Sequence, residues 1–422
     1  MVQTFGYISV QPDWPIDVRN ALRGVEGAHT FWVSAYMPTH KSIHGKIRAS
    51  AAPAPDASAS LVSLDVDADG DISAEYLGPR QLRLSSSTLD IPPALYTSAR
   101  KTTACPQIAR GTGVRGFDIS PYGGLLVACG DDGVMDVYET EAGAHRVQLQ
   151  GHLGDVTCCQ FFPSGQVVLS GASDMRLKIW SASDGTNPTT LVGHTATITD
   201  LAIVGVGKNV LSSAKDGTVR LWNCGNSLLL HTFALSDAAI NRIHLVDKGT
   251  REESELPPNE FETDGKFVAV ACEDGRVVVL DLRLKKTIAV FGSVGGLPMR
   301  AVAYDIERGL LVAGQSDGSV LIWSDANPEA PPIHSFKRGQ SSVSVIRLVR
   351  RSSASSLICV GTEDGQLYLV SLDITVGAEI IEDLVAFDVD PISQIRAIPT
   401  DAPNATRQSI WAAGQDSRVC MF

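Results

Sequence analysis

Two sets of side chains in this chain bring together the residue types of a hydrolytic triad. The first set is His152, Ser170, Asp174 and Trp180, and the second is His194, Ser212, Asp216 and Trp222. A serine that a histidine deprotonates and an aspartate orients can act as the nucleophile of an acyl transfer. Each member of the second set follows its counterpart by 42 residues. An enzyme rarely needs its triad twice, so we interpret both sets as parts of a repeated scaffold.

The spacing of the two sets identifies the elements that must position them. A period of about 40–45 residues, with Gly-His at the start and tryptophan at the end, is the signature of WD-repeat propeller blades. In WD-repeat proteins such a set forms a hydrogen-bonded tether: the aspartate accepts from the histidine, the serine bridges, and the indole N–H donates. The resemblance implies that both sets satisfy buried polar groups and lock a blade turn.

The aspartate of this pattern recurs in tight turns between alternating apolar strands. The turns are at Asp132, Asp174, Asp216, Asp274, Asp317, Asp364 and Asp416. Most continue with glycine, and an Asp-Gly turn between such strands is a strong hairpin signal. Outside the two complete sets the histidine and serine are missing, and we expect apolar packing to hold those blades instead. Seven four-stranded blades would close into an all-β ring with few exposed sheet edges.

The chain is expected to divide into a small N-terminal domain and a seven-bladed WD-repeat β-propeller. Residues 1–93 do not follow the repeat and contain a candidate helix and several candidate strands, which predicts a small α/β domain. Residues 94–422 are assigned to the propeller. Its last blade has three strands of its own, so its outer strand is expected from about 95–103. The acidic, proline-bearing segment 247–265 is predicted as a flexible insertion in blade four.

Two further motifs could carry chemistry. The run 314–318 (GQSDG) matches the GxSxG nucleophile elbow, but that elbow needs a strand-to-helix turn and a strand is expected here. The run 65–73 (DVDADGDIS) places carboxylates at alternate positions around a glycine, as calcium loops do. Its glutamate ligand would fall at Tyr76, and its flanks are typical of strands; an Asp-Gly hairpin tip explains the run, and calcium binding stays an alternative. We predict no catalytic residue, metal site or cofactor.

Charge and composition limit the classes of partner. The net charge of −12 disfavours nonspecific binding to nucleic acid or to an anionic membrane and favours a basic protein partner. The eight cysteines include no CxxC pair, which suits free thiols in a reducing compartment. The N-terminus lacks the features of a signal peptide, and no apolar run is long enough to span a bilayer. We expect a soluble protein of the cytoplasm and nucleus, monomeric by itself.

The loops at one face of the ring are the expected binding surface, because propellers bind partners through rim loops that a rigid scaffold holds in place. The acids expected there are Asp131, Asp155, Glu273 and Glu363. We interpret them as an acidic rim for a basic protein surface; solvated turns of an acidic protein are the alternative. Arg115 and Arg300 occupy matching first-strand positions of two blades, where they could line the central channel or pair with the rim acids.

In blades two and three, the residues between the repeated Gly-His, Asp and Trp positions resemble those of one particular protein family. Residues 151–185 (GHLGDVTCCQFFPSGQVVLSGASDMRLKIWSASDG) and 207–225 (GKNVLSSAKDGTVRLWNCG) resemble the proteasomal ATPase-associated factor family, WD-repeat assembly chaperones of the 26S proteasome regulatory particle. The Phe-Phe-Pro-Ser-Gly element at 161–165 and the Leu-Trp-Asn-Cys-Gly ending at 221–225 are its most specific parts. The plan of a small N-terminal domain before seven blades is also similar.

The resemblance implies a chaperone that is not an enzyme. It implies binding to the C-terminal domain of an AAA ATPase subunit of the proteasome base, which is held during ring assembly, kept from engaging the core particle too early, and then released. The insertion departs from the family's layout and puts contacts near blade four in doubt. Another WD-repeat scaffold or ubiquitin-ligase substrate adaptor would differ only in its rim contacts. An enzyme would rest only on the serine motifs above.

Overall fold

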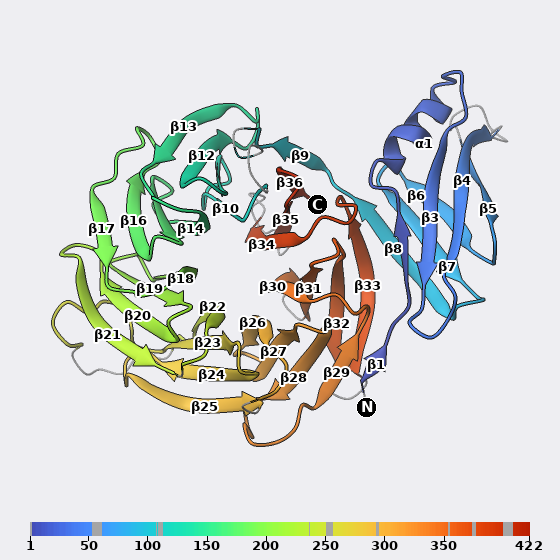
Figure 1. Cartoon of the computed structure of the whole chain (residues 1–422). Coiled ribbons are helices and arrows are strands. Elements are labelled where there is room, and N and C mark those ends of the chain that lie inside the picture. The colour runs from blue at the N-terminus through green and yellow to red at the C-terminus, as the bar shows by residue number, and fades with distance from the viewer. Residues whose placement is uncertain are drawn as a thin grey trace.

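The computed structural model of the chain is a ring of blades with a small domain at its side (Figure 1). It describes residues 2–52, 61–106, 108, 113–235, 237–249, 256–292, 295–352, 355–373, 377–399 and 408–422. Within these residues, seven antiparallel blades follow one another around a central axis. The all-β propeller that the repeat predicts is confirmed.

Blades one to three are four-stranded meanders of consecutive strands. Blade one contains β10 (Gly116–Ile119), β11 (Leu125–Cys129), β12 (Val134–Glu139) and β13 (His145–Gln150). Blade two contains β14 (Val156–Phe161), β15 (Val167–Ala172), β16 (Arg176–Ser181) and β17 (Thr189–Val192). Blade three contains β18 (Ile198–Val204), β19 (Asn209–Ala214), β20 (Thr218–Asn223) and β21 (Leu228–Ala234). Each predicted turn aspartate lies between the second and third strands of its blade.

Blades four to seven continue the same order. Blade four contains β22 (Ile240–Asp247), β23 (Lys266–Cys272), β24 (Arg276–Asp281) and β25 (Lys286–Gly292). Blade five contains β26 (Met299–Asp305), β27 (Leu310–Gln315), β28 (Ser319–Ser324) and β29 (His334–Lys337). Blade six contains β30 (Val343–Ser352), β31 (Ser355–Thr362), β32 (Leu367–Asp373) and β33 (Gly377–Val385). Blade seven begins with β34 (Ile392–Pro399), β35 (Gln408–Gly414) and β36 (Arg418–Met421).

The turns share one backbone requirement. The residue after each turn aspartate has a positive φ, and in blade one Asp132 itself has one as well. Glycine reaches this left-handed region without the penalty of a Cβ. Blades two and seven place Met175 and Ser417 there instead, at φ values of 65° and 63°. The frequent Asp-Gly pair of the repeat therefore reflects the turn conformation.

The ring closes with a strand from the N-terminal side of blade one. β9 (Lys101–Ala104) pairs antiparallel with β36 and completes blade seven. The segment 95–103, which the sequence predicts as one closing strand, is divided between two blades. Its first part lies in β8 (Ile91–Ser98), which runs parallel to β33 of blade six. The prediction was wrong on this point because the chain leaves blade six at Ala99 before it reaches blade seven.

The N-terminal domain consists of two antiparallel sheets and a helix. One sheet contains β2 (Tyr7–Val10), β3 (Thr30–Tyr36), β4 (Ile43–Ala52) and β5 (Leu61–Ala68). The other contains β6 (Ser73–Gly78) and β7 (Gln81–Ser86) with β8, and the helix is α1 (Trp14–Leu22). Trp14, Phe31, Ile47 and Leu84 lie in its core. The predicted boundary at residue 93 falls inside β8, because that strand belongs to both this domain and blade six.

A second strand also joins the domain to the ring. β1 (Gln3–Thr4) runs parallel to β29 and extends blade five. The chain thus leaves the propeller at blade five and returns to it at blade six. Among the described residues no helix is long and apolar enough to cross a membrane.

The predicted insertion 247–265 is partly built into the fold. Residues 250–255 lie outside the described part, but residues 256–265 pack beneath blade three. Asn209 and Asn223 donate from their side-chain amides to the carbonyl oxygen of Asn259, at 3.2 and 2.8 Å. Glu260 and Thr263 are buried. The prediction of a flexible segment was wrong for these residues, because blade-three side chains satisfy a backbone that has no apolar period of its own.

Candidate functional site

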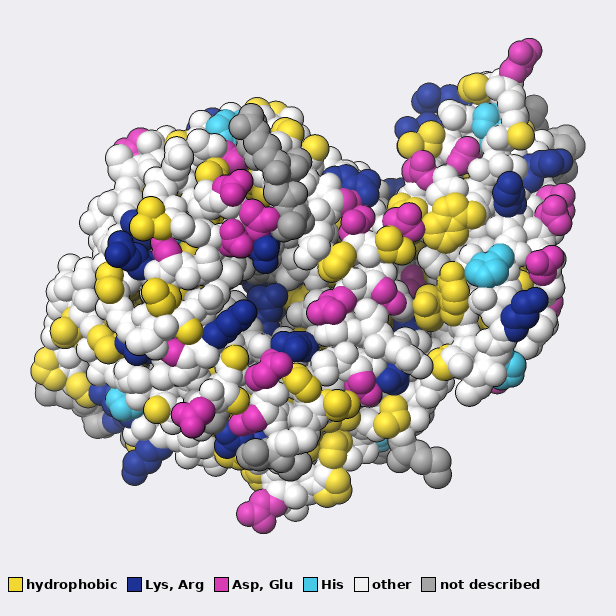
Figure 2. Space-filling model, viewed as in Figure 1, with side chains coloured by type: hydrophobic (Ala, Val, Ile, Leu, Met, Phe, Trp, Pro, Cys, Tyr) yellow, Lys and Arg dark blue, Asp and Glu magenta, His cyan; other side chains and the backbone are white. Residues whose placement is uncertain are grey.

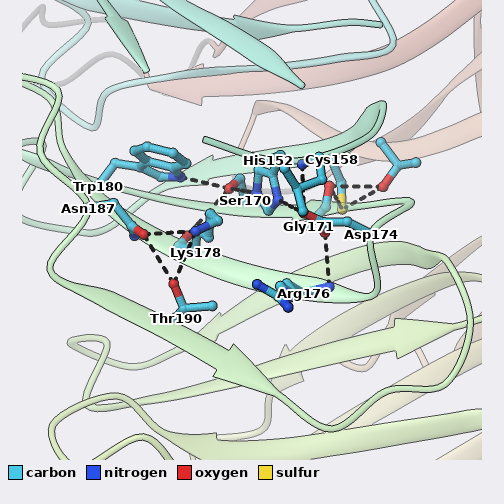
Figure 3. A network of polar contacts seen from close by, with 12 residues as sticks. His152, Cys158, Ser170, Gly171, Asp174, Arg176, Lys178, Trp180, Asn187 and Thr190 are labelled. Carbon is cyan, nitrogen blue, oxygen red and sulfur yellow. Dashed lines mark hydrogen bonds and ion pairs between the residues drawn. The ribbon is translucent and has the colours of Figure 1, made fainter. Parts of the chain in front are cut away.

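The first set of four forms a tether in blade two (Figure 3). The indole N–H of Trp180 donates to Ser170 Oγ at 2.8 Å, and His152 Nε2 lies 2.7 Å from the same oxygen. His152 Nδ1 lies 2.9 Å from Asp174 Oδ2, which also accepts from the backbone N–H of Leu153 at 3.0 Å. The tether therefore connects the loop before β14 to the β15–β16 turn and to β16.

The second set repeats this geometry in blade three. Trp222 Nε1 lies 2.9 Å from Ser212 Oγ, and His194 Nε2 lies 2.8 Å from that oxygen. His194 Nδ1 lies 2.8 Å from Asp216 Oδ2, and the backbone N–H of Thr195 donates to the same carboxylate oxygen at 3.0 Å. The two copies differ by no more than 0.1 Å in any of these four contacts.

Burial determines what the tethers can do chemically. Burial lowers the pKa of His152 although Asp174 favours its charged form, so the imidazole is neutral near pH 7. Burial also opposes ionisation of Asp174, but hydrogen bonds from Leu153 N–H and His152 outweigh it and hold the pKa of Asp174 below its ordinary value. Ser170 has an exposed fraction of 0% and its Oγ already serves the histidine and the indole. The array holds a turn and leaves no room for a substrate carbonyl.

The turn aspartates of other blades have different partners. In blade four Arg276 donates through Nε and Nη2 to Asp274 Oδ2, at 3.0 and 2.6 Å. In blade seven Arg418 forms the same kind of ion pair with Asp416. The positions equivalent to the tether serine are buried apolar residues, namely Ala128, Val270, Ala313, Val360 and Ala412. The prediction that apolar packing replaces the tether was incomplete, because a cation also holds the turn carboxylate in blades four and seven, and Lys337 Nζ lies 3.1 Å from Asp317 Oδ2 in blade five.

The predicted rim residues meet around one end of the central channel. A cavity of about 490 Å³ opens there, and Arg115, Asp155, Arg300 and Glu363 are among its lining residues. We call this cavity the channel mouth. Asp131 and Glu273 are not among the lining residues, but they form ion pairs with Arg115 and Arg300, which are. The structure therefore brings all six predicted residues together.

Most of the rim acids are paired within the protein. Arg115 forms ion pairs with Asp131 and, at 3.5 Å, with Asp155. Arg300 binds Glu273 through both terminal nitrogens, at 2.7 and 3.1 Å. The channel mouth is also lined by Lys215 and Arg242, and on the face in view Figure 2 shows basic and acidic side chains together around the central opening. The opening has mixed charge. Glu363 is exposed there, the side chain of Asp155 is 46% exposed, and that of Glu273, held by Arg300, is 37% exposed.

Comparison with known proteins identifies the family. The WD domain, G-beta repeat family matches residues 143–181 and 185–223. "Probable proteasomal ATPase-associated factor 1" of Dictyostelium discoideum is 33% identical over 96% of this chain and 94% of that protein. "Proteasomal ATPase-associated factor 1" of Homo sapiens is 34% identical over 92% of this chain and 93% of that protein. The chain belongs to the proteasomal ATPase-associated factor 1 family. The resemblance predicted from blades two and three is thus confirmed, and it extends over most of the chain.

The repeat units that the WD domain family matches do not coincide with the structural blades. The match at 143–181 begins beside β13, the outer strand of blade one, and ends with the third strand of blade two. The match at 185–223 repeats this offset one blade later. A chain of such units leaves an outer strand missing at one end, which β9 supplies.

Sequence reasoning missed the polar network that fixes the N-terminal domain on blade six. The guanidinium of Arg338 is buried, makes a two-pronged ion pair with Asp383 and lies over the rings of Tyr7 and Tyr368. Tyr96 of β8 also hydrogen-bonds Asp383. No sequence signal marked these residues, because they come from five places in the chain, between β2 and β33, that only the fold brings together.

The serine and calcium motifs have structural roles. The run 314–318 spans the turn between β27 and β28, where a strand follows as predicted. In the run 65–73, the first two carboxylates lie on β5 and Ser87 Oγ donates to Asp71. The part of the chain that the structure describes holds no group of three His, Cys, Asp or Glu side chains suited to a metal ion.

Proposed function

We propose that this protein is a non-enzymatic assembly chaperone that binds the C-terminal domain of an AAA ATPase subunit of the proteasome regulatory-particle base. The observation that carries the proposal is similarity along nearly the whole chain to relatives named for association with proteasomal ATPases. It acts as a monomer in the cytoplasm and nucleus, without nucleic acid, membrane or cofactor. Burial of both serine–histidine pairs supports a scaffold over an enzyme.

The channel mouth is the surface that we assign to the ATPase subunit. It is concave and stands on the rigid ring, and Asp155 and Glu363 present carboxylates there. The side chain of Asp155 is 46% exposed and shares its single arginine with Asp131. A basic side chain of the partner can therefore bind these two acids without breaking the pairs that hold Asp131 and Glu273. Complementary charge of this kind raises association rates and selects partners.

The test is capture of proteins from lysate with the tagged full-length chain. Wild type is expected to retain ATPase subunits of the proteasome base without mature core particle. The double variant Asp155→Lys/Glu363→Lys is expected to lose most of that capture. Glu141→Lys/Glu329→Lys is the matched control, because these exposed acids lie in turns between third and fourth strands, at the opposite face of the ring.

Two outcomes would contradict this proposal in different ways. Capture of cullin-ligase components in place of ATPase subunits would support the alternative, a ubiquitin-ligase substrate adaptor. Capture of ATPase subunits that is equal in both charge-reversal variants and wild type would keep the partner but exclude the channel mouth as its binding surface.

A further inference from the structure

A second concavity lies between the N-terminal domain and the ring, and we call it the interdomain cleft. Its volume is about 590 Å³, which is within the range of ligand-binding pockets. Its walls come from α1, the β6–β7 turn, the segment after β8, and blades six and seven. Figure 2 shows the notch between the two parts of the molecule, with dark-blue basic side chains on both of its walls.

One component of the interdomain cleft is apolar. Ile16 of α1 is 53% exposed, and Leu22 lies on the same helix toward its end. Tyr76, Pro79 and Val385 continue this surface across the cleft. A half-exposed isoleucine is unremarkable alone, but apolar side chains gathered in a concave site favour a ligand with apolar groups.

The other component is a group of guanidinium groups. Arg19, Arg80, Arg100 and Arg418 line the interdomain cleft, against one carboxylate, that of Asp13. This excess of positive charge contrasts with the net charge of −12 of the chain. Arg418 is paired with Asp416, and Arg80 donates to the carbonyl oxygen of Ser98 at 3.3 Å. Within the described ranges, neither Arg19 nor Arg100 has a carboxylate within ion-pairing distance.

The two walls are held in a fixed relation to each other. β8 is hydrogen-bonded to both β7 and β33, so one strand belongs to the domain and to blade six. The Arg338–Asp383 ion pair is buried close to this strand, with Tyr96 on the same carboxylate. A site that needs no rearrangement to form loses less free energy on binding.

We propose that the interdomain cleft binds an acidic, apolar peptide segment of a partner protein, in which aspartate or glutamate alternates with leucine or isoleucine. The guanidinium groups of Arg19 and Arg100 bind the carboxylates through paired N–H donors, a geometry that lysine cannot provide. The surface around Ile16 receives the apolar side chains. A bare anion would leave this surface wet, and a neutral apolar peptide would bury both arginines without partners. This surface is separate from the channel mouth and adds a second binding activity to the proposed function.

The test uses a fluorescein-labelled octapeptide of alternating glutamate and leucine, titrated with the full-length protein and followed by fluorescence anisotropy. Saturable binding is expected, with an affinity that falls as salt rises. A second octapeptide with glutamine in place of glutamate is expected to bind at least about tenfold more weakly, because it cannot make charged hydrogen bonds. Ile16→Asp is expected to weaken binding of the first peptide.

The variants locate the site. Arg19→Ser/Arg100→Ser is expected to weaken binding at least about tenfold, whereas Arg48→Ser, an exposed arginine of β4 outside the cleft, is expected to bind as wild type does. Equal binding of both peptides, equal binding by the double variant and wild type, or no saturable binding up to about 1 mM would overturn the proposal. Asp155→Lys/Glu363→Lys is expected to bind the peptide normally, which separates this result from the test of the channel mouth.

Discussion

Blades two and seven fix the same turn by different physical means. In blade two Asp174 accepts from His152, whose side chain is completely buried and neutral. His152 also hydrogen-bonds Ser170, which accepts from Trp180. In blade seven Asp416 accepts from Arg418, whose side chain is 42% exposed and only two residues away. The first arrangement connects three segments of the chain, and the second acts within one turn.

The two arrangements should respond differently to substitution. A buried hydrogen-bond network loses stability when any member is removed, because the remaining partners cannot reach water. A partly exposed ion pair contributes little and can be replaced by another cation nearby. Blades two and three hold the full set of four. These are also the blades that match the WD domain family, at residues 143–181 and 185–223.

The largest expected effect comes from removing the turn carboxylate itself. Asp174→Ala should lower the free energy of unfolding by about 3 kcal/mol, because His152 and the backbone N–H of Leu153 lose their acceptor in a buried site. Asp416→Ala should lower it by about 1 kcal/mol or less, because Arg418 can turn to water. Urea unfolding followed by tryptophan fluorescence measures both. Equal losses would show that the tether and the ion pair are equivalent.

A smaller effect is expected from removing the bridging hydroxyl. Ser170→Ala should lower the free energy of unfolding by about 2 kcal/mol, because Trp180 Nε1 and His152 Nε2 are left without partners. The equivalent position in blade seven is already an alanine, Ala412, so the turn of that blade forms without a bridging hydroxyl. The same unfolding experiment checks the value. A variant as stable as wild type would mean that the network contributes no stability.

The smallest effect per group concerns pH. Burial lowers the folded-state pKa of His152 and His194 below 6.5. Burial also lowers that of His244, on the inner strand β22, to about 3. Below pH 6.5 the unfolded chain binds protons at these histidines that the folded chain does not bind. Their contribution to the free energy of unfolding is therefore fully present above pH 6.5 and is lost as the pH falls below it. Each histidine contributes at most about 1.4 kcal/mol per pH unit.

Unfolding measured at pH 7 and at pH 5.5 tests this dependence. Wild type and Asp416→Ala should lose stability to a similar extent, because neither lacks a histidine. His194→Gln should start less stable but lose less between the two pH values. An acid loss in His194→Gln as large as that in wild type would assign the pH dependence to other groups.

Much of the site was predictable because its signals are local. The 42-residue offset, the Asp-Gly turns and the strand alternation depend on residues close together in the chain, and they predicted the ring and the loops that carry the rim acids. The tethers followed from the resemblance of the two sets to WD repeats. The charge balance of the channel mouth was not predictable. Whether Arg300 faces solvent or Glu273, which lies 27 residues before it, depends on side-chain positions across two blades.

By itself, the sequence determined the repeated unit and its turns, because period and turn chemistry act over a few residues. Only the tertiary structure decided which distant segments complete the ring. It divided 95–103 between blades six and seven, docked 256–265 on blade three, and buried Arg338 between the N-terminal domain and blade six. These contacts join segments up to about three hundred residues apart, and they depend on shape and satisfied polar groups that appear only when the ring has closed.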